Sequence, residues 1–342
     1  MFDDFQPLWP FISGNSQTVA SQFWPQPKQI CGDFVRQLVP IGMEGDLSIA
    51  INRPKDWTSN RSIVVLIHGL TGSEDSTHIV RLSHRLVNER YLCIRMNMRG
   101  CGPGSGLARG IYHSGRSEDI DAVLKWTSLQ FPDSPIIAIG VSLGGNALLK
   151  HAGELGLQSK TRKSSHLKAV ISISAPIDLA ASSRLLSHQK NSVLNRYFSS
   201  RLLKHVSKIN KQWPDSIPSI NQSYNKSSLS LAEFDEVYTA PASGFLNAAD
   251  YYTRCSALPL LRHINVPTIL LTAKDDPIVD WSCYPNNDGN PKIKSLITKS
   301  GGHVGWLSSK KIGTCDRFWM DDRVINWISE INQYQSHSID DE

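Results

Sequence analysis

Ser142 lies in a sequence pattern that can activate a hydroxyl group for covalent chemistry. Residues 140–144 read Gly-Val-Ser-Leu-Gly, follow the apolar run 135–139 and precede the helix-like run 146–150. A serine between a strand and a helix, with glycines two positions away on each side, is typical of a nucleophile elbow, in which a strained turn lifts the hydroxyl clear of the sheet. The glycines leave room where a Cβ would clash. We therefore expect Ser142 to be a nucleophile.

A serine nucleophile needs a base and a carboxylate, and the sequence supplies both downstream in the usual order. The apolar run 267–273 is followed by Lys-Asp-Asp-Pro, which puts Asp275 and Asp276 just beyond the end of a predicted strand. We favour Asp276 as the acid because Pro-Ile-Val follows it and forms a hydrophobic turn, with Asp275 as the alternative. His303 follows the last predicted strand in Gly-Gly-His-Val-Gly, and this open backbone favours it as the base.

Two backbone N–H groups are expected to bind the oxyanion that forms when the serine attacks a carbonyl group. Leu143, directly after the serine, would supply the first. The second would come from the loop 68–72, which follows an apolar run. Leu70 is the expected donor there, with Thr71 as the alternative. We expect His68 to fix the shape of this loop and to take no part in catalysis.

A parallel sheet is expected to hold these residues, because short apolar runs alternate along the chain with helical patterns. The inner runs are continuous in Val, Ile and Leu, which is typical of strands covered on both faces. We predict an α/β fold with a mostly parallel eight-stranded sheet flanked by helices. The predicted strands span residues 34–41, 47–52, 62–68, 91–97, 136–142, 169–175, 268–273 and 293–298, and the predicted helices span residues 77–89, 115–130, 146–155 and 323–332.

The alternation stops after residue 176 and resumes only near residue 267, a longer gap than a crossover between strands needs. Inside this gap, apolar residues between positions 185 and 202 recur at roughly helical spacing. We predict a helical cap, residues 177–257, inserted into a core domain made of residues 1–176 and 258–342. The alternative is an ordinary pair of covering helices with a long surface loop.

The composition is that of a globular enzyme, since 40% of the 342 residues are hydrophobic and 20% are charged. No apolar run approaches the roughly 20 residues of a membrane span. The first residues, Met-Phe-Asp-Asp, lack the basic and apolar segments of a secretory signal. The six cysteines are scattered without the spacing of a metal site, and they fit reduced thiols. We expect a cytoplasmic protein without a structural metal.

The net charge of +5 is concentrated in one part of the chain, the basic region 150–211, which has twelve Lys or Arg residues but only Glu154 and Asp178. Such a block is usually a solvated face. The functional alternative is transient contact with an anionic membrane surface or attraction of an acidic substrate. No nucleic-acid motif accompanies the block, and the Gly-rich stretch 99–106 does not match a dinucleotide loop. Nucleic acid and nucleotide partners are therefore not expected.

The sequence resembles one family in particular, the YheT-like α/β-hydrolases, which are related to eukaryotic abhydrolase-domain esterases and lipases. The resemblance implies an α/β-hydrolase fold and a cofactor-free carboxylic-ester hydrolase with the triad Ser142, Asp276 and His303. Family members are associated with short-chain model esters and, in eukaryotes, with acylglycerols and phospholipids. Beyond the elbow, the resemblance rests on residues 14–18, 68–72, 98–102, 112–115, 118–119, 234–235, 239–241, 244–245, 250–252, 273–277 and 301–305.

The expected function is hydrolysis of a small-molecule acyl ester of short or medium chain length, an acylglycerol or a phospholipid, through an acyl-enzyme on Ser142. One alternative is acyl transfer to an alcohol or lysolipid by the same triad. The His-x-x-x-x-Asp motif of related transferases is absent from the obvious place, because Ser308 stands five residues after His303. A second alternative is a catalytically idle binding or scaffold protein with the same fold.

Overall fold

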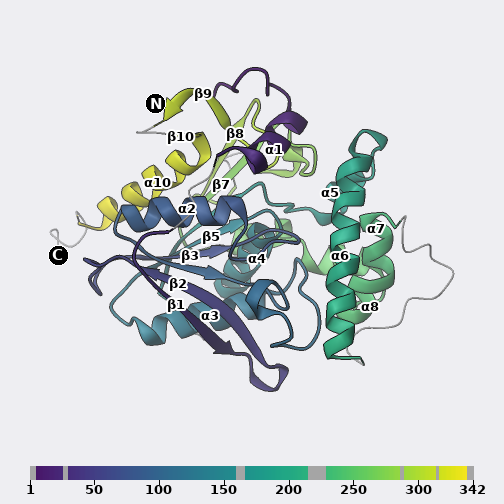
Figure 1. The fold of residues 1–342 in the computed structure, drawn as a ribbon, viewed down its shortest axis with the longest axis horizontal. Helices are drawn as coiled ribbons and strands as arrows, with labels where there is room; N and C mark the ends of the chain where they lie inside the picture. Colours follow the sequence, from purple (N-terminus) through teal and green to yellow (C-terminus); the bar gives the residue numbers. More distant parts are fainter. Residues whose placement is uncertain are drawn as a thin grey trace.

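An eight-stranded sheet is the framework of the protein (Figure 1). The structure, a computed structural model, describes residues 5–25, 30–158, 166–214, 229–285, 289–312 and 316–336. The strand order is β1-β2-β4-β3-β5-β6-β7-β8. Strand β2 pairs antiparallel with β1 and β4, and every other neighbouring pair in this sheet is parallel. The strands are β1 (Asp33–Pro40), β2 (Asp46–Arg53), β3 (Ile63–Ile67), β4 (Leu92–Met96), β5 (Ile136–Val141), β6 (Leu167–Ile173), β7 (Thr268–Ala273) and β8 (Ile293–Thr298). The predicted mostly parallel eight-stranded sheet is confirmed.

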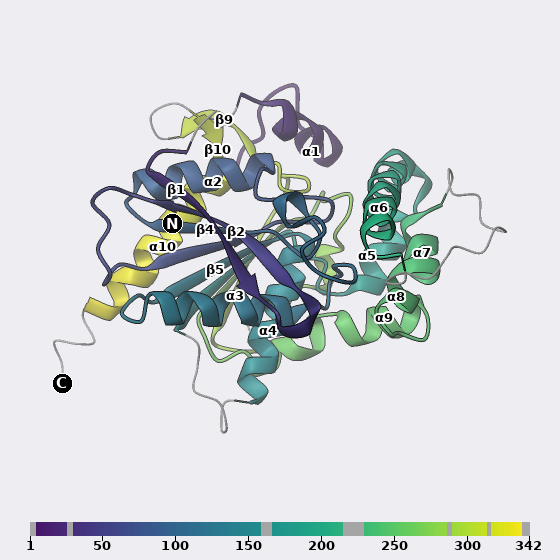
Figure 2. The same ribbon diagram turned by 60° about the horizontal axis from the view of Figure 1, so that its bottom comes forward.

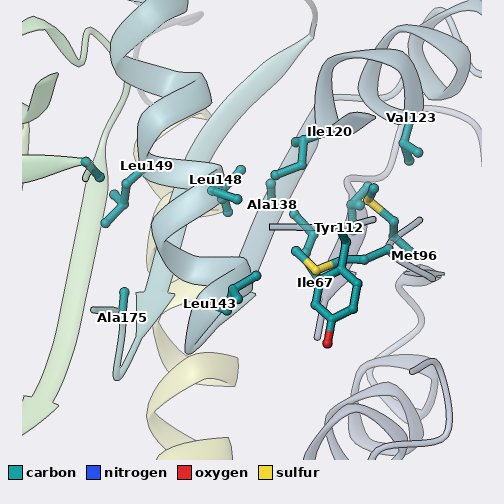
Figure 3. Packing of buried hydrophobic residues seen from close by; sticks show 14 of the residues in the cluster. Ile67, Met96, Tyr112, Ile120, Val123, Ala138, Leu143, Leu148, Leu149 and Ala175 are labelled. Carbon is teal, nitrogen blue, oxygen red and sulfur yellow. The ribbon is translucent and has the colours of Figure 1, made fainter. Parts of the chain in front are cut away.

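Helices cover both faces of this sheet, as the continuous apolar strands require. Figure 2 shows α2 (Thr77–Asn88) and α10 (Trp319–Ser336) on one face and α3 (Ser117–Gln130) and α4 (Leu143–Leu157) on the other. In β3, Val64 and Leu66 belong to the buried cluster formed with α2 and α10, whereas Ile63, Val65 and Ile67 belong to the cluster formed with α3 and α4. Figure 3 shows part of the cluster formed with α3 and α4, in which Tyr112 lies near Ile67 and Met96.

All four predicted helices are present, but two of them begin earlier than predicted. Helix α4 begins at Leu143 instead of 146, because the turn at Ser142 leads directly into the helix. Helix α10 begins at Trp319 instead of 323. The sequence-based boundaries of both helices were therefore wrong at the amino end, and in α4 the difference places the first helical residue directly after Ser142, the predicted nucleophile.

One helix and a small second sheet were not predicted from the sequence. Helix α1 (Gly14–Phe23) is mostly polar and lacks a clear apolar stripe, so hydrophobic periodicity does not reveal it. Its start is stabilised locally by a capping box between Ser13 and Ser16. The second sheet pairs β9 (Leu307–Ile312) with β10 (Asp316–Phe318), antiparallel.

A group of helices lies between β6 and β7, where the cap was predicted. In Figures 1 and 2 they gather on one side of the molecule, beside the sheet. None of the helices in the described ranges is long and apolar enough to cross a membrane. The domain boundaries at residues 177 and 257 stay predictions. The helices are α5 (Leu179–Leu186), α6 (Ser192–Gln212), α7 (Leu231–Phe234), α8 (Ala240–Ala242) and α9 (Ala248–Cys255), with a π-helical turn at Asp235–Thr239 and short 3-10 helices at Gln189–Asn191 and Leu258–His263. Elsewhere, 3-10 helices span Gly42–Glu44, Gly102–Gly104 and Trp281–Cys283.

Candidate active site

Ser142 occupies a strained turn between β5 and α4. Its φ of 54° and ψ of −123° lie in a region that residues with a side chain rarely adopt. The turn is tight enough that a Cβ on Gly140 would meet the backbone of Gly144 and Gly145, and a Cβ on Gly144 would meet the carbonyl oxygen of His68. The glycine spacing found in the sequence is therefore a packing requirement of this turn.

His303 joins Ser142 to Asp276 through hydrogen bonds at both ring nitrogens. Its Nδ1 lies 2.9 Å from Asp276 Oδ2, and its Nε2 lies 2.9 Å from Ser142 Oγ. A carboxylate only accepts hydrogen bonds, so the ring proton belongs on Nδ1, and Nε2 is left to accept from the serine hydroxyl. The structure thus brings the three residues together in the order that proton transfer from the serine requires.

The carboxylate of Asp276 is fully buried and held in place by the turn that follows it. Its Oδ1 accepts hydrogen bonds from the backbone N–H groups of Ile278 at 2.8 Å and Val279 at 3.0 Å. These bonds leave Oδ2 directed to the imidazole of His303. The Pro-Ile-Val turn noted in the sequence therefore positions this acid.

Asp275, the alternative acid, does not form a hydrogen bond with the histidine ring. Its Oδ1 accepts from the backbone N–H of Gly302 at 2.9 Å, so this carboxylate supports the loop that presents His303. Burial raises the pKa of Asp275, and the N–H donors of the loop oppose that rise. Geometry therefore favours Asp276 over its neighbour as the partner of the imidazole.

Two backbone segments flank Ser142 where an oxyanion would form. Leu143 is the first residue of α4, and the first N–H groups of a helix have no partner within the helix. In the loop after β3, the N–H of Thr71 donates to the Tyr112 hydroxyl at 2.7 Å, so this alternative donor is already occupied. Leu70 and Leu143 both line the cavity that contains Ser142. The structure thus favours Leu70 over Thr71.

His68 holds the loop after β3 and does not reach the serine. Its Nε2 accepts from the Met98 N–H at 3.0 Å, so Nδ1 carries the proton and donates to the Gly69 carbonyl at 2.7 Å. Complete burial lowers the pKa of His68 to about 4, which keeps the ring neutral. The side chain is therefore placed as the sequence analysis expects, as a support for the loop.

Helix α1 supports the histidine loop, a role that the sequence analysis missed. Thr18 Oγ1 accepts from the backbone N–H of His303 at 2.8 Å and donates to the Gly14 carbonyl. Gln17 is fully buried and bonds both backbone groups of Leu307, donating to the carbonyl at 3.1 Å and accepting from the N–H at 2.7 Å. In the sequence, the family resemblance at residues 14–18 singled out this segment, but it did not indicate what the residues do.

The segment 112–115, to which the sequence assigned no role, lies between α4 and α9 and is bonded to both. Asn146 of α4 donates to the carbonyl oxygens of Ser114 at 3.0 Å and Cys255 at 2.8 Å, and its own oxygen accepts from the Ala257 N–H. The Ser114 N–H donates to the Tyr251 hydroxyl. One buried amide, that of Asn146 in α4, therefore ties this segment to the end of α9.

A mostly apolar cavity opens beside Ser142, between the core and the predicted cap. Its wall also contains a few polar side chains from α5, the π-helical turn and α9. Among the residues that the structure describes, no group of three or more His, Cys, Asp or Glu side chains is arranged to hold a metal ion. The apolar lining includes Ile111, Leu143, Leu179, Leu186, Phe198 and Ile278.

Comparison with known proteins agrees with this architecture. The sequence model of a family described as alpha/beta hydrolase fold matches residues 62–309. YheT of Escherichia coli strain K12, which is named as an esterase, is 30% identical over 95% of this chain and 93% of its own length. Human phospholipase ABHD3 is 29% identical over 86% of this chain and 71% of its own length.

A solved structure gives the same architecture. The esterase Pf2001 of Pyrococcus furiosus superimposes with a TM-score of 0.56 at 17% identity, and the superposition covers 98% of each chain. At this identity the likeness concerns the fold alone.

Proposed function

The chain belongs to the α/β-hydrolase family, and from this we propose that it hydrolyses carboxylic esters with Ser142, His303 and Asp276 as its catalytic triad. The observation that carries the proposal is the continuous hydrogen-bonded path from Ser142 Oγ through the imidazole to the buried carboxylate. The path ends at the wall of a mostly apolar cavity, where an acyl group fits.

Acylation of the enzyme begins when His303 Nε2 takes the proton of the Ser142 hydroxyl as Oγ bonds to the ester carbonyl carbon. The carbonyl oxygen becomes an oxyanion, which accepts hydrogen bonds from the N–H groups of Leu143 and Leu70. Asp276 stabilises the imidazolium that forms, without taking the proton itself. The ester C–O bond then breaks, and His303 gives its proton to the departing alcohol.

Deacylation repeats these steps with water in place of the serine. His303 removes a proton from water as the water oxygen bonds to the acyl carbon. The same two N–H groups bind the second oxyanion. The bond from the acyl carbon to Ser142 Oγ breaks, the serine oxygen recovers its proton from the imidazolium, and the carboxylic acid leaves. No cofactor takes part in this proposed cycle.

The lining of the cavity supports a short or medium acyl chain as the part of the substrate that it holds. The names of the relatives, an esterase and a phospholipase, support acyl esters that include acylglycerols or phospholipids. A cytoplasmic location and transient contact of the basic region with an anionic membrane belong to the same proposal. Part of that region, residues 159–165, lies outside the described residues.

The first test is hydrolysis of p-nitrophenyl esters from acetate to palmitate. The wild type should show an optimum in chain length, and Ser142→Ala should lower kcat by about 10⁴-fold or more. Ser182→Ala is a matched control, because Ser182 lines the same cavity but has no bond to the triad side chains. Equal rates for Ser142→Ala and wild type would contradict the proposal.

Two further measurements separate the alternative functions. A fluorophosphonate probe should label the wild type but not Ser142→Ala, whereas an idle scaffold would not react. Added ethanol or a lysolipid should leave the carboxylic acid as the main product. Formation of the new ester in excess of the acid would instead assign the acyl-transfer alternative.

A further inference from the structure

A buried carboxylate, Asp235, lies in the wall of the cavity that contains Ser142, on the side built by the predicted cap. Asp235 begins the π-helical turn after α7. Its Oδ1 accepts from the Thr239 hydroxyl at 2.7 Å, and its Oδ2 accepts from the Tyr252 hydroxyl at 2.9 Å. Ser183 of α5 lies 3.2 Å from the same tyrosine hydroxyl. Three elements of the cap thus meet at one polar group in a mostly apolar wall.

No cation of the described residues forms an ion pair with Asp235, and the groups that bond it are neutral hydroxyls. Burial raises the pKa of Asp235 to about 6, and the bonds from Thr239 and Tyr252 oppose this rise. The group therefore carries a negative charge at neutral pH. A buried charge without an opposite charge is costly, and a neutral acceptor would hold the turn without that cost. Such a group in a cavity is a candidate for ligand recognition.

Aromatic side chains share the cavity with this carboxylate. Phe198, Phe234, Tyr251 and Tyr252 all line it, and the rings of Tyr251 and Tyr252 are 5.3 Å apart. Aromatic faces attract cations, most strongly where water is excluded, and substituted ammonium groups are a common ligand of such sites. A carboxylate among aromatic rings has the chemistry that recognises an organic cation.

We propose that Asp235 and the surrounding aromatic rings bind a substituted ammonium group, so that the preferred substrates are acyl esters that carry one positive charge. The inference rests on the proposed ester hydrolysis at Ser142, because both groups line one cavity. It makes Asp235 a specificity-determining residue that contacts the substrate away from the reacting carbonyl.

The test compares pairs of esters that differ only in the charge of one group. Butyrylcholine and 3,3-dimethylbutyl butyrate place the charged group and its neutral carbon isostere on the alcohol side. The p-nitrophenyl esters of 4-trimethylammoniobutyrate and 5,5-dimethylhexanoate do so on the acyl side. In at least one pair, kcat/KM of the wild type should favour the cation by about tenfold or more. A ratio near one or below in both pairs would overturn the proposal.

Asp235→Asn removes the charge and keeps the shape, and the ratio in the favoured pair should fall to about one. Taking the ratio cancels any change that affects both esters equally. An unchanged ratio in Asp235→Asn would therefore indicate a purely structural role for Asp235 and would contradict the proposal. Glu236→Gln is the matched control. Glu236 is the next residue, is exposed, accepts from the Ala248 N–H and does not line the cavity; this variant should keep the ratio.

A second test uses the wild-type protein alone, so its result does not depend on whether a variant folds. The preference for the cationic ester should decline as the pH falls through about 6, because Asp235 gains a proton there. Tyr251 and Tyr252 of α9 face this carboxylate, and burial holds the pKa of each above its ordinary value, so both stay neutral over this range. Ser183 and Thr239 do not titrate, and Glu236 is exposed. A ratio independent of pH between 5 and 8 would contradict the role of Asp235.

A binding measurement distinguishes a failure of this inference from a failure of the proposed ester hydrolysis. If the wild type hydrolyses none of the four esters, ester hydrolysis fails, and calorimetry with choline and with 3,3-dimethylbutan-1-ol decides the inference by itself. Tighter binding of choline to the wild type, lost in Asp235→Asn, would support the cation site. Equal or weaker binding of choline would overturn it.

Discussion

Two neighbouring carboxylates, of which the sequence favours Asp276 as the acid and keeps Asp275 as the alternative, contact different parts of the site. Asp276 bonds the imidazole of His303, and Asp275 bonds the N–H of Gly302 one residue earlier. Their side chains leave the backbone in different directions at the end of β7, so one reaches the ring and the other reaches the loop that holds it. The two carboxylates therefore have different partners, the imidazole for Asp276 and the backbone of the histidine loop for Asp275.

The two variants Asp276→Asn and Asp275→Asn should separate these roles. Asp276→Asn should lower kcat for p-nitrophenyl butyrate by about 10⁴-fold, because an amide stabilises neither the required tautomer nor the imidazolium. Asp275→Asn keeps an oxygen that can accept from Gly302, so its loss in kcat should stay within about tenfold. The reverse order of the two losses would make Asp275 the acid.

The buried charge of Asp235 should make the protein less stable as the pH rises. Its pKa is about 6 in the folded protein, above the ordinary aspartate pKa of 3.8, so the folded state binds the proton more tightly than the unfolded chain. Stability therefore falls as the pH rises from about 4 through 6, with a cost of about 3 kcal/mol above that range. Asp235→Asn should remove this component of the pH dependence, measured by urea unfolding at pH 5 and pH 8. An identical pH dependence in both proteins would contradict the cost.

At the scale of elements, the loop that carries His303 is bonded by helix α1, whose residues do not line the cavity of Ser142. Helix α1 is far from the histidine in sequence, yet Thr18 bonds the backbone of His303 and Gln17 bonds that of Leu307. These are buried polar groups that pair across the fold, and each is costly to leave without a partner. The helix therefore holds in position the loop that carries the imidazole of His303.

Thr18→Val tests this support with little change in shape. It leaves the N–H of His303 without its acceptor, so kcat should fall by about tenfold while KM changes little, because the ring is displaced and the substrate cavity is not. Thr127→Val is the control, since the Thr127 hydroxyl is also buried but bonds Val123 within α3. Steady-state kinetics of both variants, with melting temperatures, would decide. Equal losses in the two variants would show a general loss of stability instead of a local role.

At the scale of the whole molecule, positive charge is concentrated on helix α6. Helix α6 has five Lys or Arg residues and no Asp or Glu. Arg201, Lys204 and Lys208 follow one face at helical spacing and line a cleft shared with the loops near Gly72 and Gly102. Like charges on one face repel one another and favour an anionic partner.

Charge reversal on α6 should weaken binding to anionic membranes. Wild type should bind phosphatidylserine vesicles more strongly than phosphatidylcholine vesicles, and the difference should shrink as salt is added. Arg201→Glu with Lys208→Glu should lower the partition by about 100-fold. Lys292→Glu with Lys294→Glu, an exposed position just before β8 and an exposed position in it, should change the partition much less. Equal partition of wild type and the α6 variant in co-sedimentation would contradict membrane contact.

The sequence by itself determined the sheet and the candidate triad. All eight predicted strands are present. The inner ones could be recognised because strands buried on both faces need continuous apolar runs, such as those of β3 and β5. Ser142 and His303 could be chosen because glycines flank both of them in the sequence. Glycine is the residue expected where a turn is too tight for a side chain or the backbone must be sterically open.

The tertiary structure alone decided which side chains meet. It showed that Asp276, which the sequence favours, bonds the imidazole while Asp275 bonds the histidine loop. It also brought Thr18 to that loop and placed Asp235 in the cavity of Ser142. Helix α1, β9 and β10 were missed because they lack the apolar period that reveals an element. The side-chain contacts have a different physical reason: a hydrogen bond between distant residues depends on direction and distance in space, and neither leaves a periodic trace along the chain.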